Sequence, residues 1–128
     1  MGQCLITRKG AIMPSTFLIA SSLKFNQNYN GNNTCTSTMV INSNAYSYVG
    51  FKITTLPDYN SQAYVQVKNA SGTVIKTMKT TGNFICAVPT NANFTLIVNS
   101  VHIGDNKYAL LKKIVLGKTV EDVTNYLA

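Results

Sequence analysis

Large apolar residues occupy every second position in two short segments, residues 84–88 and 94–98, which are separated by the sequence PTNAN. A period of two is that of a β-strand, because successive side chains point to opposite faces of the sheet. The pattern therefore predicts two strands that each bury one face, with Cys86 acting as a small apolar residue. The inner face is expected to consist of Phe84, Cys86, Val88, Phe94, Leu96 and Val98.

Similar segments recur along most of the chain, each followed by turn-forming residues. Residues 62–68 alternate strictly between apolar and polar positions. The sequence NASG, with Gly72 placed for a positive φ, joins them in a hairpin to residues 73–79. Gly50 is expected at a bulge or a close contact. Other strands are expected at residues 3–8, 15–25, 39–41, 45–56 and 107–117. A strand about every 10 residues is typical of an antiparallel sandwich or barrel.

One segment of the N-terminal part lacks this alternation. Residues 26–38, NQNYNGNNTCTST, show no apolar period and are rich in turn-forming residues. They are expected to form the longest polar loop and the best exposed contact surface. Residues 1–38 as a whole are therefore interpreted as an extended arm or loop attached to the sandwich.

The C-terminal residues carry the one pattern that is typical of a helix. Thr119 is expected to cap a helix whose first turn contains Glu121 and Asp122. A helix of about two turns is not stable alone, so residues 118–127 are expected to dock on their own sheet or on a neighbouring subunit. The docking face is predicted to contain Val120, Val123, Thr124 and Leu127.

These elements predict a single domain, residues 1–128, which is long enough to bury a core without metals or disulfides. The expected fold class is all-β: an antiparallel β-sandwich, immunoglobulin-like or prealbumin-like, with a short C-terminal helix. No stretch approaches the roughly 18 apolar residues of a membrane-spanning helix, so no membrane partner is expected.

Charged residues are scarce and unbalanced in sign. They make up 12% of the chain, about half the usual share, and the eleven lysine and arginine residues outnumber the four acids, for a net charge of +7. The lysines are scattered, whereas nucleic-acid-binding proteins usually cluster their basic residues, often with aromatic platforms. No nucleic-acid partner is therefore expected. A surface rich in uncharged asparagine, threonine and tyrosine suits assembly with other protein chains.

Residues that could carry catalysis or bind a metal are few. The three cysteines, Cys4, Cys35 and Cys86, lack the paired spacing of a zinc site, and a Cys4–Cys35 disulfide stays open. The single histidine, His102, precedes Asp105 by three residues, but no nucleophile motif accompanies them. A local hydrogen bond near a strand end is the simpler interpretation of His102. Phosphate-binding loops and paired carboxylates are also missing. We therefore expect no catalytic, cofactor-binding or metal-binding residues and no enzymatic activity.

The tyrosines are the remaining candidates for function. The chain has seven tyrosines and no tryptophan, and Tyr46 and Tyr48 are expected to share one strand face. An exposed face rich in tyrosine and asparagine can bind a glycan or a protein. Alternatively, tyrosine is common in strands simply because its ring packs half-buried on a sheet. The candidate interaction surface consists of Tyr29, Tyr46, Tyr48, Tyr64 and Tyr126.

Residues 62–99 resemble the small β-sandwich modules of phage and bacterial surface proteins. Those modules share the pattern V-x-V-x-N-x-x-G-x-V, followed by F-x-x-x-V-P-x-x-x-x-F/Y-T-L-x-V. The matching residues are Val65, Val67, Asn69, Gly72, Val74, Phe84, Val88, Pro89, Phe94, Thr95, Leu96 and Val98. This resemblance implies a fold and is silent on function.

Both ends of the sequence are similar to phage tail proteins. MGQCLITRKG, residues 1–10, is similar to the opening of short tail-region proteins of phages that infect Gram-positive bacteria. LLKKIVLGKTVEDVT, residues 110–124, looks like a segment of tail-fibre and baseplate-associated proteins. The matching positions in that segment are Lys113, Val115, Gly117, Thr119, Asp122 and Thr124.

The resemblance implies a structural protein of the virion, tail- or baseplate-associated, that acts by self-assembly and by contacts with other virion proteins. Two alternatives stay open. The first is a capsid decoration protein, whose basic surface would sit on an acidic shell. The second is a receptor-binding module that contacts a host-surface glycan. No cofactor is implied by any of the three.

Overall fold

The computed structural model describes residues 13–128, with only the backbone of Asp105 and Asn106. These residues form eight strands and one helix. The strands are β1 (Thr16–Asn30), β2 (Asn33–Asn42), β3 (Tyr48–Thr55), β4 (Tyr64–Asn69), β5 (Val74–Met78), β6 (Gly82–Ala87), β7 (Asn93–His102) and β8 (Asp105–Gly117). The helix is α1 (Val120–Leu127). The strand expected at residues 3–8 lies outside the described part of the chain.

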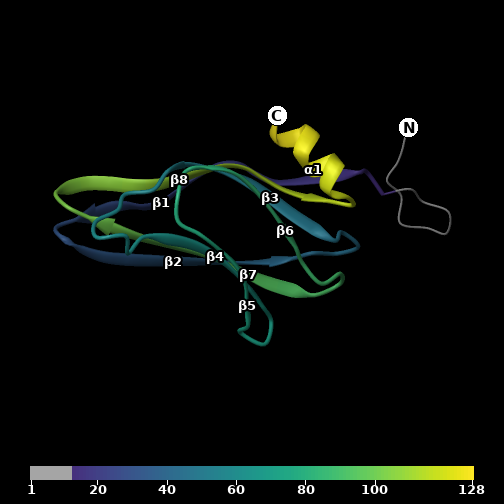
Figure 1. The fold of residues 1–128 in the computed structure, drawn as a ribbon, viewed down its shortest axis with the longest axis horizontal. Coiled ribbons are helices and arrows are strands. Elements are labelled where there is room, and N and C mark those ends of the chain that lie inside the picture. The colour runs from purple at the N-terminus through teal and green to yellow at the C-terminus, as the bar shows by residue number, and fades with distance from the viewer. Residues whose placement is uncertain (1–12) are drawn as a thin grey trace.

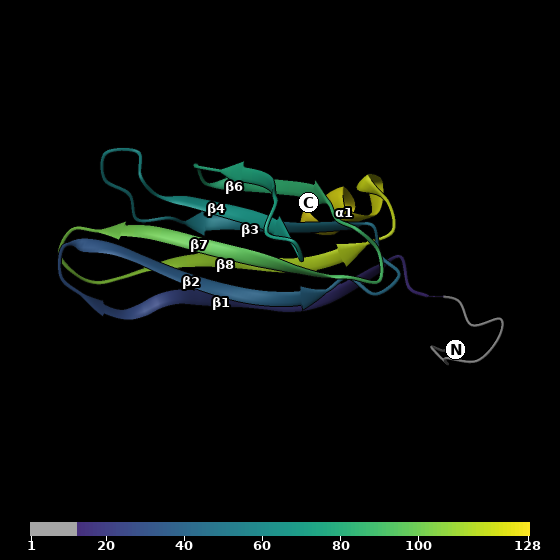
Figure 2. The ribbon, with the colours of Figure 1, turned by 90° about the horizontal axis from the view of Figure 1, so that it is seen from below.

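Two antiparallel sheets of four strands lie face to face (Figures 1 and 2). The strand order is β1-β8-β3-β6 in the first sheet and β2-β7-β4-β5 in the second. Apart from the β4–β5 hairpin, each connection carries the chain from one sheet to the other. Eight strands connected in this way form a jelly roll.

The expected antiparallel β-sandwich with a short C-terminal helix is confirmed, but its strand order needs a correction. In an immunoglobulin domain the first two strands share a sheet, whereas β1 and β2 lie in different sheets here. The observed order is therefore that of a jelly roll and differs from the expected immunoglobulin-like one. The period-two pattern reports which face of a strand is buried, and it carries no information on which strands are neighbours.

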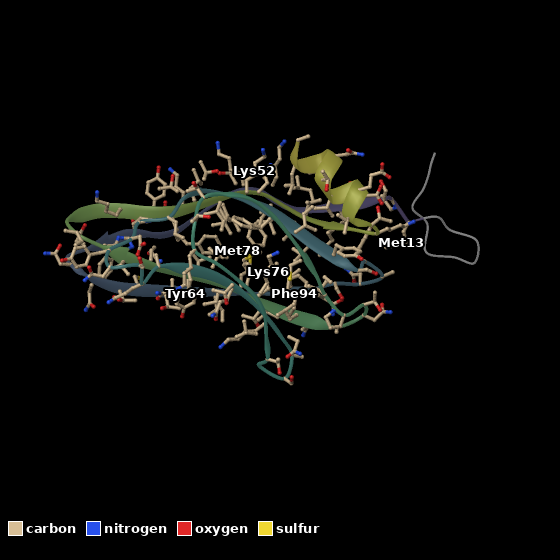
Figure 3. The ribbon with its side chains drawn as sticks, in the orientation of Figure 1. Met13, Lys52, Tyr64, Lys76, Met78 and Phe94 are labelled. Atoms are coloured by element: carbon tan, nitrogen blue, oxygen red, sulfur yellow. The ribbon has the colours of Figure 1, made fainter. Side chains whose placement is uncertain are left out.

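The core between the sheets contains the residues that the alternation predicts. Phe84 is half-buried, and the other five of the six predicted residues are buried in one apolar cluster. Met78 and Phe94 lie between the sheets, whereas Lys52 points outward on the side that carries α1 (Figure 3). The β4–β5 hairpin is also confirmed, with a φ of 88° at Gly72.

A bulge at Lys113 changes the face that β8 buries. Lys113 has a φ of 54°, and the pairing of β8 with β3 shifts register at this point. Ala109 and Leu111 face the core before the bulge, and Ile114 and Leu116 face it afterwards. The inward positions therefore pass from odd to even numbers, which is why KYALLKKIVLG shows no simple alternation.

Residues 26–38, expected to form a polar loop, are strand except at Gly31 and Asn32. The expectation of an extended arm over residues 1–38 is accordingly wrong from Thr16 onward. The segment does alternate, since Thr34, Thr36 and Thr38 are exposed while the residues between them are half-buried. Threonine is a good strand former. The inward positions are Cys35 and Ser37, which are small and not strongly apolar. The period of two is therefore present in burial but not in the hydrophobicity of the sequence.

Helix α1 docks on the outer face of its own sheet, above β3 and β8 (Figure 1). The Thr119 hydroxyl accepts a hydrogen bond of 3.1 Å from the backbone N–H of Asp122, which confirms the predicted cap. Val123 and Leu127 are buried against Val115, whereas Val120 and Thr124 are exposed. The docking face is thus narrower than predicted.

Two glycines make room for the helix. A Cβ atom at Gly117 would overlap the Val123 side chain, and one at Gly50 would overlap Val123 and crowd Leu127. The close contact expected at Gly50 is therefore confirmed, and the register of β3 on β8 also shifts beside it.

Gly117→Ala should destabilise the protein by about 1–3 kcal/mol, because overpacking forces the helix away from the sheet. Val123→Ala removes the methyl groups that the new Cβ would meet. The added cost of Gly117→Ala should therefore be smaller in a Val123→Ala background, by about 0.5–3 kcal/mol. Urea unfolding of the two single variants and the double variant measures this coupling. Strictly additive changes in the free energy of unfolding would show that Gly117 does not make room for Val123 of the helix.

Candidate functional site

Three connections meet at one end of the sandwich: the β1–β2 turn, the β3–β4 connection and the β7–β8 turn. This end lies opposite α1 and the N-terminal side of the molecule (Figures 1 and 2). The three connections line an open surface pocket of about 290 Å³, here called the loop-end pocket, with His102 and Ile103 in its wall. The side chains that the first two connections and the start of β2 contribute are Asn32, Asn33, Thr34, Tyr59, Asn60 and Gln62.

A second pocket of about 240 Å³ adjoins the loop-end pocket. Val101 and Ile103 line both pockets, so the two share a wall. The second pocket differs in charge, because Asp58 and Lys107 line it.

The β3–β4 connection is held in one conformation by its own hydrogen bonds. The Asp58 carboxylate accepts bonds from the backbone N–H groups of Gln62 (3.0 Å) and Ala63 (2.9 Å). Asp58 therefore stabilises this turn. Asn60 and Ser61 have φ values of 59° and 55°, a left-handed conformation that is uncommon for residues other than glycine. Such strain persists only where surrounding contacts impose it, and it is concentrated at functional sites.

A network of polar side chains ties β1 to β2 and β7 beside this end. Asn26 has a φ of 63° and lies where the β1–β8 register shifts. Its amide nitrogen donates to the Ser100 hydroxyl (3.0 Å) and to the Cys35 carbonyl (3.2 Å), and its amide oxygen accepts from the Ser37 hydroxyl (2.5 Å). Asparagine tolerates the left-handed conformation, so this one residue both forms the bulge and satisfies the inward polar groups.

His102 is the fully buried last residue of β7. Its Nε2 lies 2.6 Å from the Ser100 hydroxyl, which confirms the expected local hydrogen bond at a strand end. The Tyr29 ring packs against the imidazole with centroids 4.7 Å apart. The Nδ1 atom is buried without a hydrogen-bond partner in the described structure. Burial lowers the pKa of His102, and the charge of Lys107 lowers this pKa further, so the ring is neutral at pH 7.

The remaining parts of the sequence-based site prediction are separated in space or lie outside the described residues. Only the backbone of Asp105 is described, so how its side chain lies relative to His102 is outside the described structure. Cys35 is half-buried and Cys86 is buried, both as free thiols, while Cys4 precedes the first described residue. Burial raises the pKa of the Cys86 thiol, an effect that the charge of Lys76 partly offsets, in keeping with packing rather than reactivity.

The tyrosines proposed as one surface lie in different places. Tyr46 is buried in the core, where its hydroxyl donates to the Pro14 carbonyl (3.0 Å), and burial raises its pKa. Tyr48 packs beside α1 on the outer face of the first sheet, and Tyr126 belongs to α1 itself, so Tyr46 and Tyr48 do not share a face. Tyr64 is half-buried on β4, and Tyr29 covers His102.

The exposed tyrosine at the pocket is one that the sequence analysis passed over. Tyr59 is 53% exposed and lies in the turn PDYNS. An aromatic residue within a turn is a signal that could have identified it, since loops held by a rigid scaffold often carry binding residues. Its neighbours Asn32 and Thr34 lie far from it in sequence, and only the fold brings them together.

Comparison with known protein families and with curated protein sequences found no match. In the portion of the chain that the structure describes, no group of three or more histidine, cysteine or acidic residues is placed to hold a metal ion. Over the same residues, no helix has the length and apolarity needed to cross a membrane.

The burial of His102 makes folding stability sensitive to pH. The folded-state pKa lies below the usual value of 6.5, so on acidification the unfolded chain takes up the proton first. The free energy of unfolding should therefore fall as the pH drops through about 6.5 toward the lower folded-state pKa. Urea unfolding at several pH values measures this slope.

His102→Phe is the matched variant, because phenylalanine keeps a planar ring beneath Tyr29 and cannot titrate. His102 is the single histidine of the sequence, so the variant should lose most of the slope. A slope of equal size in the variant would contradict the assignment to His102.

Proposed function

We propose that the protein is a non-enzymatic structural component of a phage virion that assembles with further copies of itself and with other virion proteins through the exposed edge of β2. The terminal sequence similarities favour a place in the tail or baseplate. The jelly roll is an architecture of viral capsid proteins and of lectins, which supports the same reading as an analogy between folds. The proposal rests on the observation that the edge strand β2 is long and carries no charged residue.

Strand β2 is an edge strand of ten residues without a charged residue, a proline or a glycine. An edge strand presents unpaired backbone N–H and C=O groups that can pair with another chain. Monomeric proteins usually protect such edges with short strands, lysine, proline or bulges. The pairing of β2 with β7 runs without a register shift from Asn33 to Asn42, so β2 is also free of bulges. Its Val40 is 64% exposed, which adds apolar surface beside the unpaired backbone.

The neighbouring edge strand supports the same contact. Strands β1 and β2 run along one side of the sandwich (Figure 2). On β1, Phe17 and Leu18 are exposed large apolar residues, at 50% and 40%. Exposed apolar surface on a soluble protein marks a site of interaction with another molecule when it is concentrated.

The opposite side of the sandwich is protected. Strands β5 and β6 are the edges there, with five and six residues. The Lys76 side chain on β5 donates a hydrogen bond of 3.4 Å to the Ile85 carbonyl on β6, so it links the two sheets. The contrast between the two sides supports assembly through the β1–β2 side alone.

A specific observation also favours the capsid decoration alternative. Lys52 on β3 and Lys112 on β8 are directly paired in the first sheet, and both point away from the core. Like charges opposite each other destabilise a sheet, so an acidic partner surface would relieve this repulsion. Locating the protein in particles by electron cryomicroscopy separates a tail or baseplate position from a position on the shell.

Thr38→Lys should abolish or strongly weaken self-association, because it places a charge on the β2 edge. Thr77→Lys is the matched control, since Thr38 and Thr77 lie at opposite ends of one row across the sheet, through Ile97 and Gln66. Both threonines are exposed. Size-exclusion chromatography with light scattering over a range of concentrations measures the mass of each variant.

A wild-type protein that stays monomeric at every concentration would contradict assembly through β2, and so would equal effects of the two lysine variants. The wider proposal of a virion role is tested separately by immunodetection of the protein in purified particles. Its absence from particles would contradict that role even if the protein self-associates.

A further inference from the structure

We infer that the loop-end pocket is a binding site for a neutral saccharide. Its polar groups are available for a ligand: the side-chain amides of Asn60 and Gln62 and the Tyr59 hydroxyl make no hydrogen bond within the described structure. Asn32 and Asn33 use their amide oxygens to accept from the backbone N–H groups of Gly104 (2.5 Å) and Thr34 (2.8 Å). Their NH₂ groups therefore remain as donors.

The kind of polar group matches sugar hydroxyls. A hydroxyl both donates and accepts hydrogen bonds, and a side-chain amide offers two donors and one acceptor oxygen. The described side chains that line the loop-end pocket include no aspartate, glutamate, lysine or arginine, and His102 is neutral at pH 7. Anionic ligands are typically held by arginine or lysine, and Lys107 lines the adjoining pocket instead. The chemistry thus favours an uncharged ligand with many hydroxyl groups.

The pocket also offers apolar surface at its rim. Tyr59 is 53% exposed and Ile103 is 48% exposed, and both line the loop-end pocket. A sugar ring has an apolar C–H face that packs on an aromatic side chain, while the Tyr59 hydroxyl stays in water. This pocket therefore places an exposed aromatic ring beside uncharged amide groups.

The site is held in place before a ligand arrives, which lowers the entropy cost of binding. Asn32 joins the β1–β2 turn to the β7–β8 turn through Gly104, and the Val101 N–H donates to the Pro57 carbonyl (2.9 Å) to fix the β3–β4 connection. His102 belongs to the pocket wall, and its Nδ1 atom is buried without a hydrogen-bond partner in the described structure. An unsatisfied buried polar atom costs about 1–3 kcal/mol, and violations of this kind are expected at functional sites.

The size of the site suits a short saccharide. At about 290 Å³, the loop-end pocket is just below the range of roughly 300–1,000 Å³ that is typical of ligand pockets. The adjoining pocket of about 240 Å³ shares its wall of Val101 and Ile103. A first ring in the loop-end pocket could therefore continue into the second pocket as a disaccharide or longer chain.

The test is a titration of the full-length ¹⁵N-labelled protein with neutral monosaccharides and disaccharides, after a glycan array has selected the sugars. Amide resonances of residues 32–34, 59–62 and 101–104 should shift. Tyr59→Ala and Asn60→Gly should each weaken binding by about tenfold or more, equivalent to ~1.4 kcal/mol. Glycine accepts the φ of 59° at position 60, so Asn60→Gly removes the amide without adding strain.

Asn91→Gly is the matched control. Asn91 is also exposed, has a φ of 52°, and lies in the β6–β7 connection at the other end of the sandwich. This variant should bind as the wild type does. The inference is overturned if no neutral sugar binds, if only acidic sugars bind, if the shifts map elsewhere, or if binding survives both pocket variants. Tyr59 and Asn60 lie in the β3–β4 connection, outside β2, so the effect of their substitution on sugar binding is separate from assembly through β2.

Discussion

The structure depends on β7 and β8, two interior strands that follow each other in the chain but belong to different sheets. Strand β7 is hydrogen-bonded between β2 and β4, and β8 between β1 and β3. The turn that joins them therefore crosses from one sheet to the other at Ile103 and Gly104. Because β1 and β2 are their outer neighbours, the β1–β2 turn must lie beside this crossing. The bond from Gly104 to Asn32 shows that it does.

Both proposed functions follow from this arrangement, through different parts of the molecule. Placing β7 and β8 inside leaves β2 at an edge, where the backbone groups facing away from β7 have no partner within the sheet. The crossing at Ile103 lies at the end of the sandwich where three connections meet. Side chains from these connections line the loop-end pocket. A virion protein that carries a saccharide site would combine assembly with attachment to a surface, and the two surfaces could be altered independently by substitution.

Sequence reasoning recovered the buried faces, because Phe94, Leu96 and Val98 repeat at the strand period and are buried by the fold. It failed where inward positions are polar: Ser37 and Ser100 hydrogen-bond to Asn26, and Ser100 also hydrogen-bonds to Nε2 of His102. The bulge at Lys113 left no recognisable signal, since lysine is not a residue that usually adopts a positive φ. The loop-end pocket could not be predicted because its residues come from three distant connections. The helix was predicted from its cap. The space that it occupies on the sheet could not be predicted, because Gly50 and Gly117 lie together beneath Val123 only in the folded structure.

The claim that β2 is an assembly edge is tested most directly by hydrogen exchange at several protein concentrations. Alternate N–H groups of an edge strand point away from its neighbour, and they exchange freely unless another chain covers them. If copies pair through β2, exchange in peptides covering residues 33–42 will slow as concentration rises, while exchange in β5 will stay unchanged. Exchange in β2 that is independent of concentration, or protection that appears equally in β5, would contradict assembly through this edge.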